Sequence, residues 1–300
     1  MCSVESRAIR VGRVKAVDDK ILCEPQEISG PAAVWALLES VPSKVPKTMC
    51  VRDSKILDDL EICLEDDLYR GVFRDDRIKR RILDAVAGAS IPEETIAEFR
   101  LLAKVDSYSY RHILMVTALA TRMALDFSYE DAALGFLISA CLTHDYGKSR
   151  ISREILCSNA FLTEDEIQQI KAHPITSCLL ARYYFQEDRR AEIALVHHER
   201  MDGTGYPFSE RLLDREVRLI QVCDMFDALI SPRSFRQAPF RCREALDYLI
   251  EEALAGSVDG DVVKLLVSYV RAEATDWRSV RLYKGRTSIL GKQGTYRHIR

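Results

Sequence analysis

The sequence predicts a mainly α fold, in which a helical bundle follows a small mixed α/β N-terminal domain. Three observations lead to this prediction. After residue 90, apolar residues recur at helical spacing almost without interruption. Before residue 90, a strand-like alternating segment is followed by helical segments that prolines interrupt. The chain has 300 residues, of which 47% are hydrophobic, enough for one large core and a smaller unit. We therefore divide it into residues 1–90, the helical domain 91–270, and a basic tail 271–300.

The first 90 residues contain one predicted strand and one clear helix start. Residues 8–17 alternate loosely between apolar and charged side chains, as a half-exposed strand does. Pro31 opens an apolar helical segment that halts before Pro42 and Pro46. The acidic stretch 58–67 is interleaved with leucines and predicts the solvated face of an element. We expect this domain to be regulatory or to bind a partner protein.

The helical domain carries helix-start signals of its own. The pairs Ser90–Glu93 and Thr163–Glu166 have the spacing of capping boxes, so we expect a helix to begin at each. Ser128 precedes an apolar stripe that ends at His144. Further helices are predicted over residues 189–198, 216–231, 242–255 and 261–271. In the tail, a hairpin turn is predicted at Gly291–Gly294.

Composition excludes several classes of protein. The formal net charge of −3 gives no broad attraction to DNA or RNA, so an anionic substrate must be held by local cations. No apolar run approaches the roughly 20 residues that span a bilayer, and the first residues lack the apolar core of a secretion signal. The nine cysteines are scattered, without a CxxC pair, and predict reduced thiols. We expect a cytoplasmic protein.

The histidines are the feature that predicts chemistry. Five of the six lie between His112 and His198, on several predicted helices, and most have a carboxylate or a second histidine beside them. Imidazole nitrogens combined with carboxylate oxygens suit divalent iron, manganese, zinc or nickel. An aspartate directly after a histidine, as in His144-Asp145, can use its two oxygens to bridge two ions. Helical bundles build metal sites from side chains that facing helices point inward. The sequence therefore predicts a dinuclear metal centre.

The order of these motifs resembles that of the HD-GYP family. In chain order they are His112, then His144-Asp145 with Gly147-Lys148, then His173-Pro174, then the HHExxDGxGYP run from His197 to Pro207, and then Asp224 in Asp-Met-Phe-Asp-Ala-Leu. The resemblance covers about residues 100–270. Proteins of this family are all-α, metal-dependent phosphodiesterases that hydrolyse the bacterial second messenger cyclic di-GMP, and the resemblance implies the same for this chain. The resemblance thus implies an HD-type helical bundle.

Carried over position by position, the resemblance implies two divalent ions, iron or manganese, in a set of seven ligands. One ion is assigned to His112, His144, Asp145 and Asp224, and the other to Asp145, His173, His197 and His198. Asp145 bridges the two, and a hydroxide shared by the ions attacks phosphorus in line. Lys148 contacts the scissile phosphate, so Asp145 and Lys148 form the catalytic pair. Tyr206, Arg233 and Arg236, together with Lys148, are implied to hold the substrate.

Other polar residues near these motifs receive simpler interpretations. Asp202 and Asp227 are expected to orient ligands or to cap helices. Glu199 is interpreted as a surface carboxylate. Cys141 and Cys223 lie next to ligands in sequence, but we expect them to be small packing residues.

Three departures from the common family pattern bear on substrate fit. Where several members have a glutamate that helps to hold a third ion, this chain has Tyr108, and a phenol is a poor ligand at neutral pH. The loop Cys157–Leu162 lacks the Lys-Pro-Gly of relatives, and Ser234–Phe235 replaces a frequent Pro-Tyr. We expect these changes to affect the substrate and not the metals.

The function that follows is hydrolysis of a cyclic dinucleotide, first of all cyclic di-GMP, to the linear dinucleotide and onward to GMP. Two alternatives stay open. The enzyme can act on another nucleotide phosphodiester, such as a mixed cyclic dinucleotide. The protein can also be a metal-bound effector that binds a nucleotide or a partner protein without turnover. The native metal and the oligomeric state also stay open.

Overall fold

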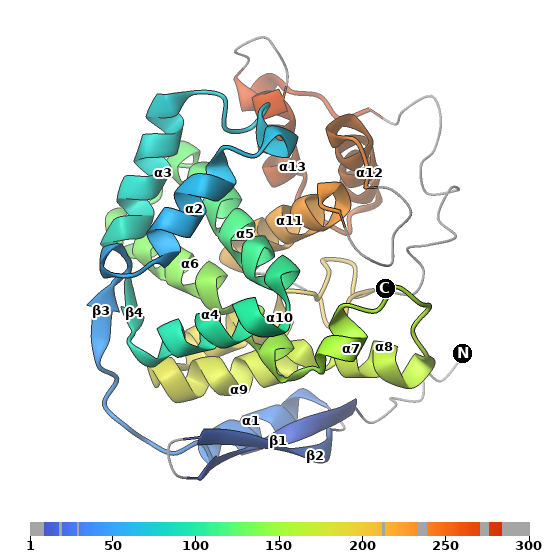
Figure 1. Cartoon of the computed structure of the whole chain (residues 1–300). Coiled ribbons are helices and arrows are strands. Elements are labelled where there is room, and N and C mark those ends of the chain that lie inside the picture. The colour runs from blue at the N-terminus through green and yellow to red at the C-terminus, as the bar shows by residue number, and fades with distance from the viewer. Residues whose placement is uncertain are drawn as a thin grey trace, which may run out of the picture.

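A computed structural model describes residues 9–17, 20–28, 30–211, 214–232, 239–270 and 276–283. The chain is mainly α, as predicted (Figure 1). The helices are α1 (Pro31–Glu39), α2 (Ile56–Leu64), α3 (Asp76–Gly88), α4 (Glu94–Val105), α5 (Ser107–Asp126), α6 (Asp131–Thr143), α7 (Arg153–Leu156), α8 (Glu164–Lys171), α9 (His173–Phe185), α10 (Asp188–Val196), α11 (Arg215–Ile230), α12 (Cys242–Ala255) and α13 (Gly260–Val270). The strands are β1 (Ile9–Val17), β2 (Lys20–Ile28), β3 (Thr48–Cys50) and β4 (Ser90–Pro92). Single 3₁₀ turns are η1 (Val51–Asp53), η2 (Asp67–Tyr69), η3 (Tyr146–Arg150) and η4 (Trp277–Ser279).

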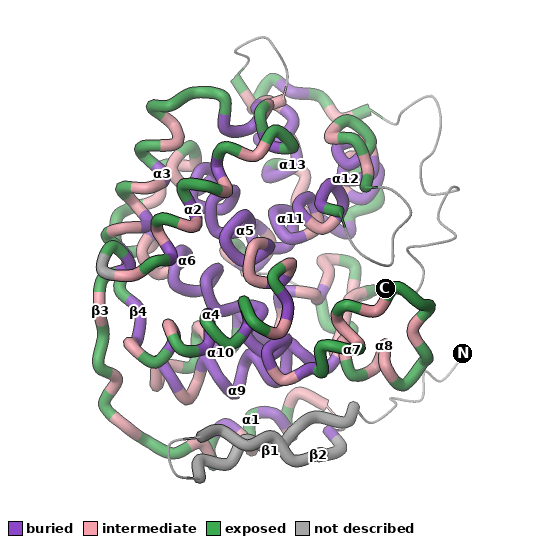
Figure 2. The backbone as a smooth tube through the Cα atoms, viewed as in Figure 1, coloured by how far each residue is buried: buried purple, intermediate pink, exposed green. Residues whose placement is uncertain are grey.

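Helix α5 is the central element of the bundle. Its N-cap is Asp106, whose carboxylate accepts hydrogen bonds from the backbone N–H groups of Tyr108 and Ser109. From His112 to Ala124 every side chain is buried, because α2, α4, α6 and α11 pack around the helix (Figure 2). A helix buried on all sides carries His112 directly into the protein interior.

The N-terminal segment forms a hairpin and a helix beside α9. Strands β1 and β2 pair antiparallel, with Ile9 opposite Ile28 and Val17 opposite Lys20. Helix α1 buries Val34 and Leu38 in a small apolar cluster with residues of α9 and α10, and the hairpin lies next to α9 (Figure 1). The strand predicted over residues 8–17 and the helix predicted from Pro31 are both confirmed.

Helices α2 and α3 belong to the same hydrophobic core as the bundle. Leu60 and Leu64 of α2, and Ile82 and Val86 of α3, are buried in one cluster with α5 and α11. The boundary that the sequence places near residue 90 therefore does not coincide with a break in packing. The division into domains stays a prediction.

Of the helix-start signals in the helical domain, one is confirmed and two are wrong. The capping box Thr163–Glu166 is confirmed at the start of α8. The one expected at Ser90 is wrong, because Ser90–Pro92 pairs as β4 with Thr48–Cys50, and α4 begins only at Glu94. Ser128 does not cap α6 either; it adopts a positive φ of 58°, and Glu130 is the N-cap. Pairing with a distant strand overrode the local signal at Ser90.

The later helices match the predicted ranges to within two residues at each end. Helices α10, α11, α12 and α13 correspond to the predicted segments 189–198, 216–231, 242–255 and 261–271. Of the tail, only residues 276–283 are described, so the hairpin expected at Gly291–Gly294 lies outside the described residues. None of the helices in the described part of the chain is both long and apolar enough to cross a membrane.

Candidate metal centre

Seven side chains from five helical regions converge at the middle of the bundle. They form two groups, each compact enough to hold a metal ion. We call subsite A the group His112 on α5, His144 at the end of α6, and Asp224 on α11. We call subsite B the group Asp145 after α6, His173 at the start of α9, and His197 and His198 after α10. All seven were predicted as ligands from the sequence, and all are buried except His198, which is partly exposed.

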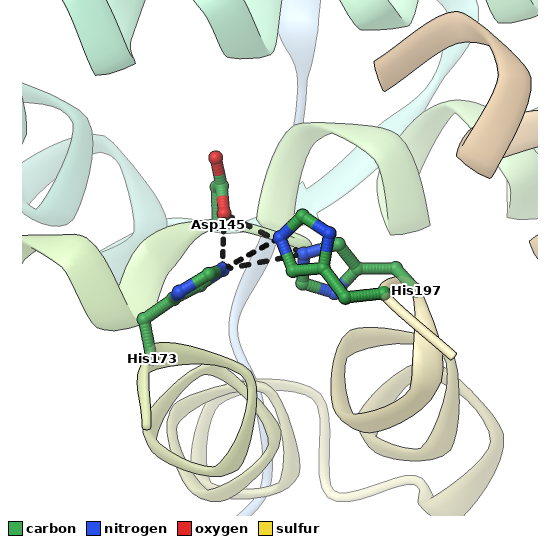
Figure 3. Close-up of side chains that lie close together, drawn as sticks. Asp145, His173 and His197 are labelled. Carbon is green, nitrogen blue, oxygen red and sulfur yellow. Dashed lines mark hydrogen bonds and ion pairs between the residues drawn. The ribbon is translucent and has the colours of Figure 1, made fainter. Parts of the chain in front are cut away.

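Asp145 lies between the two subsites. Its Oδ1 is 2.9 Å from Nε2 of His173 and 3.6 Å from Nε2 of His197 (Figure 3). Its Oδ2 is 3.6 Å from Nε2 of His112 and 3.7 Å from Nε2 of His144. Each carboxylate oxygen thus faces a different subsite, which is the arrangement that a bridging ligand needs.

Three imidazoles are held in the tautomer that ligates through Nε2. The Nδ1 atoms of His144, His173 and His197 lie 2.6, 2.6 and 2.8 Å from backbone carbonyl oxygens three residues earlier in the chain. Because a carbonyl only accepts, Nδ1–H must donate in each case, and Nε2 keeps its lone pair. A hydrogen bond of this kind fixes both ring orientation and tautomer in metal sites.

The lone pairs that face the centre fit a cation. Nε2 of His173 is 3.4 Å from Nε2 of His197, and in the neutral rings whose Nδ1–H groups donate to the backbone, both Nε2 atoms present lone pairs. Nε2 of His144 is buried and has no hydrogen-bond partner. Such a cluster of unpaired acceptors is costly unless a positive charge satisfies them. The mixed nitrogen and oxygen set matches divalent iron, manganese or zinc.

Burial favours the uncharged imidazoles that a metal requires. It lowers the pKa of His144 to about 3 and of His173 to about 4, so both are neutral at pH 7. His112 differs, because the carboxylates of Asp227 and Asp224 outweigh its burial and raise its pKa to about 9. Burial also acts on Asp145, but the Lys148 ammonium beside it outweighs burial and holds the pKa of Asp145 well below its ordinary value.

Two glycines allow the loops that carry these residues to approach the helices. A Cβ on Gly147 would lie 2.2 Å from the carbonyl oxygen of His173. A Cβ on Gly205 would lie 2.4 Å from the carbonyl oxygen of His198. No larger residue fits at either place without moving backbone. The glycines of the HDxGK and GYP motifs therefore have a steric role in the centre.

A cavity of about 940 Å³ opens above the two subsites. This is within the range of about 300–1,000 Å³ typical of small-molecule sites. Of the predicted substrate residues, Lys148 lines the cavity with its Nζ paired to Oδ2 of Asp145, and Tyr206 lines it with its ring stacked on His198 at 4.6 Å between centroids. Tyr108 also lines the cavity and stacks on His112. Arg233, Arg236 and Ser234–Phe235 lie outside the described residues.

Glu199 was predicted to be a surface carboxylate, and that prediction is wrong. The residue is 1% exposed and accepts hydrogen bonds from the backbone N–H groups of Phe208 and Glu210. Burial raises its pKa to about 7. It anchors the loop that follows the GYP motif, and its place directly after His197-His198 was the only local signal for this role.

Asp227, Cys141 and Cys223 behave as expected, whereas Asp202 serves a turn instead of a ligand or a helix start. Oδ2 of Asp227 lies 2.5 Å from Nδ1 of His112 and orients that ring. Asp202 is part of a turn and accepts from the backbone N–H and the hydroxyl of Thr204. Cys141 and Cys223 are fully buried free thiols, and burial raises the pKa of both.

Comparison with known proteins identifies a matching family and several similar proteins. The HD domain family matches residues 92–262 of the chain. A cyclic di-GMP phosphodiesterase of Pseudomonas aeruginosa is 30% identical over 234 residues, which are 74% of this chain and 56% of that protein. A 3′3′-cGAMP-specific phosphodiesterase of Vibrio cholerae is 28% identical, over 58% of this chain and 42% of that protein. A cyclic di-GMP phosphodiesterase of Thermotoga maritima is 32% identical, over 57% of this chain and 47% of that protein. The matches thus span about half the length of these curated relatives.

Proposed function

The chain belongs to the HD domain family, within its HD-GYP group, and on this premise we propose that it is a metal-dependent phosphodiesterase acting on a cyclic dinucleotide, first of all cyclic di-GMP. The products we propose are the linear dinucleotide and then GMP.

One observation carries the proposal: the two oxygens of Asp145 face two separate sets of imidazole and carboxylate ligands at the floor of a cavity. Phosphodiester hydrolysis needs charge neutralisation on the phosphate and a nucleophile placed opposite the leaving group. A two-ion site with a bridging carboxylate is built for that task. When bound, two divalent cations, iron or manganese, supply an activated water and neutralise the non-bridging oxygens.

The protein's own residues hold and orient the substrate. Lys148 is 9% exposed and lies at the cavity wall. There its ammonium, which donates to Asp145, can also donate to a phosphate oxygen of the substrate. The Tyr206 ring, already stacked on His198, offers an apolar face next to the same wall. Arg233 and Arg236 are proposed to grip the second phosphate through their planar donors.

A second substrate in the same class has a specific observation in its favour. One of the relatives is named as specific for 3′3′-cGAMP, in which one base is adenine. The two substrates share the cyclic phosphodiester ring, so the ligand set serves both equally. The loop Cys157–Leu162, which lines the cavity with most of its residues and departs from the common family sequence, is where we expect the choice of base to be made.

The test is product chromatography with protein purified without oxygen and loaded with Mn²⁺ or Fe²⁺. Cyclic di-GMP and 3′3′-cGAMP are supplied in parallel, and the linear dinucleotide is the expected product. The Lys148→Ala protein is compared with Lys264→Ala, because Lys264 also pairs with an aspartate three residues away but lies on the surface. Loss of product in the first and not in the second supports the proposal. Tight binding of a cyclic dinucleotide with no product would instead show an effector without turnover.

A further inference from the structure

A buried tyrosine from outside the matched HD domain reaches the metal centre. Tyr69, in η2, is fully buried, and its hydroxyl donates to Oδ1 of Asp227. The other oxygen of Asp227 accepts from Nδ1 of His112 at 2.5 Å. Residues 158 positions apart in the chain thus form one hydrogen-bonded line that ends at subsite A.

We propose that Tyr69 is a positioning residue of subsite A, because it holds Asp227 and, through it, turns Nε2 of His112 toward the ion. The proposal rests on the metal centre of the proposed function. The family match covers residues 92–262 and so does not include Tyr69. A segment before the HD domain therefore completes the support of one metal subsite.

The direction of the hydrogen bonds is fixed by the chemistry of the partners. Burial and the charge of Asp227 raise the pKa of Tyr69 well above its ordinary value, so the phenol keeps its proton and donates. Oδ1 of Asp227 accepts from the hydroxyl of Tyr69 and, at 3.3 Å, from the hydroxyl of Ser231, while Oδ2 accepts from His112. A carboxylate held at both oxygens cannot rotate, and neither can the imidazole that it orients.

Arg111 ties the same segment to α5 from the other side. Its guanidinium donates to Oδ2 of Asp66 at 2.6 Å and to the hydroxyl of Ser231 at 3.1 Å. Asp66 is the N-cap of η2, since its other oxygen accepts from the N–H of Leu68. Arg111 and His112 are neighbours on α5, so η2 is held to α5 at its N-cap and to α11 through Tyr69. A displacement of η2 would therefore move Asp227 and, with it, the imidazole of His112.

Two ligands of subsite B show no such dependence within the described residues. The Nδ1 atoms of His173 and His197 donate to carbonyl oxygens only three residues earlier, on segments of the HD domain itself. Subsite A therefore depends on a distant segment through Asp227, while these two ligands of subsite B are oriented locally. The difference between the two subsites makes the proposal testable.

Tyr69→Phe removes the hydroxyl and keeps the ring. The ring stacks on Phe73 at 5.9 Å and meets Phe226 edge-on at 6.3 Å between centroids, and a phenylalanine preserves both contacts. Tyr110→Phe is the matched control, since its hydroxyl also donates to an aspartate and links α5 to α2, through Asp59 at 2.6 Å. That pair does not touch Asp227.

The experiment titrates metal-free protein with Mn²⁺ by calorimetry. In Tyr69→Phe, we expect one of the two ions to bind up to about 10-fold more weakly, the lower end of the range for loss of a ligand's own hydrogen-bond partner, because Tyr69 acts on His112 through Asp227. The other ion should bind as in the unaltered protein, and Tyr110→Phe should leave both unchanged. Thermal unfolding of the metal-free proteins checks that both variants are folded.

The affected ion is assigned in two further backgrounds. In His173→Ala, which damages subsite B, Tyr69→Phe should still weaken the remaining ion. In His144→Ala, which damages subsite A, it should have no effect on the remaining ion. Wild-type binding of both ions by Tyr69→Phe, or equal weakening by Tyr110→Phe, overturns the proposal, as does an unaltered protein that binds no ion. Two bound ions without hydrolysis would defeat only the proposed function, because the titration does not depend on turnover.

Discussion

Replacing Gly147 by alanine tests how tightly the metal centre is built. Gly147 lies between the ligand Asp145 and Lys148, and its N–H donates to the hydroxyl of Ser177 at 2.8 Å. An added Cβ would lie 2.2 Å from the carbonyl oxygen of His173 and 2.8 Å from the backbone nitrogen of Ser177. Both contacts are to the backbone of the first turns of α9, so no side-chain rotation relieves them.

The size of the effect follows from how far the Cβ–oxygen distance falls below the shortest contact that a Cβ makes. Cβ contacts below 3.0 Å do not occur, so η3 and the start of α9 must separate by about 0.8 Å. A misplacement of about 1 Å can reduce catalysis about 100-fold, and overpacking costs about 1–3 kcal/mol of stability. We expect turnover of cyclic di-GMP to fall about 100-fold and the affinity of subsite B to fall with it, because His173 carries the clashing oxygen.

The assay combines steady-state kinetics at saturating Mn²⁺ with denaturant unfolding and metal titration. Gly135→Ala, in the middle of α6, is the matched control, because its Cβ meets nothing within 4 Å. That change should leave turnover unchanged and stabilise the helix by up to about 1 kcal/mol. A Gly147→Ala protein with the metal affinity and turnover of the unaltered chain would refute the reasoning, since it would show that the two backbones separate at no cost.

Three further predictions concern the ligands and the substrate. Asp145→Ala should remove both activity and most bound metal, because the oxygens of Asp145 face both subsites, whereas Lys148→Ala should keep the metal and lose turnover. Elemental analysis and product assays measure the two effects, and two ions retained in Asp145→Ala would contradict the bridging role. Arg233→Ala or Arg236→Ala should mainly raise KM, as loss of phosphate gripping in ground and transition states alike does, and an unchanged KM in both would remove them from the site. Because Tyr108 stands where relatives have a carboxylate that helps to hold a third ion, we expect two ions and accumulation of the linear dinucleotide before GMP, and Tyr108→Glu should speed the second cleavage. A time course of both products with metal counting tests this, and direct release of GMP by the unaltered two-ion protein would contradict it.

Much of the fold was predictable because it depends on local chemistry. Helical periodicity predicted α11, α12 and α13 closely, and the Thr163–Glu166 box predicted the start of α8, since capping involves residues only three positions apart. The same kind of signal failed at Ser90, where pairing with β3 decided the conformation. Short-range rules hold wherever no distant segment competes for the same backbone.

The candidate site also has a part that was predictable from the sequence and a part that was not. Motif order and the resemblance to the HD-GYP family named all seven side chains of the two subsites, because imidazole and carboxylate chemistry belongs to the residue and not to its surroundings. Glu199 shows the limit, since its carboxylate looked solvated in sequence and is buried under the loop that it anchors. Burial is set by which segments fold over a residue, and the place of Glu199 directly after His197-His198 was the only local signal of it.

The sequence by itself predicted most of the helices, and its resemblance to a known family named the seven candidate ligands and their order along the chain. Only the tertiary structure decided that the oxygens of Asp145 face different subsites and that Tyr69 supports one of them. Tyr69 and Asp227 are 158 residues apart, and neither has a sequence neighbour that signals the other. Such a contact exists because the apolar faces of α2, α5 and α11 pack into one core, which brings distant polar groups together away from water, where each needs a hydrogen-bond partner.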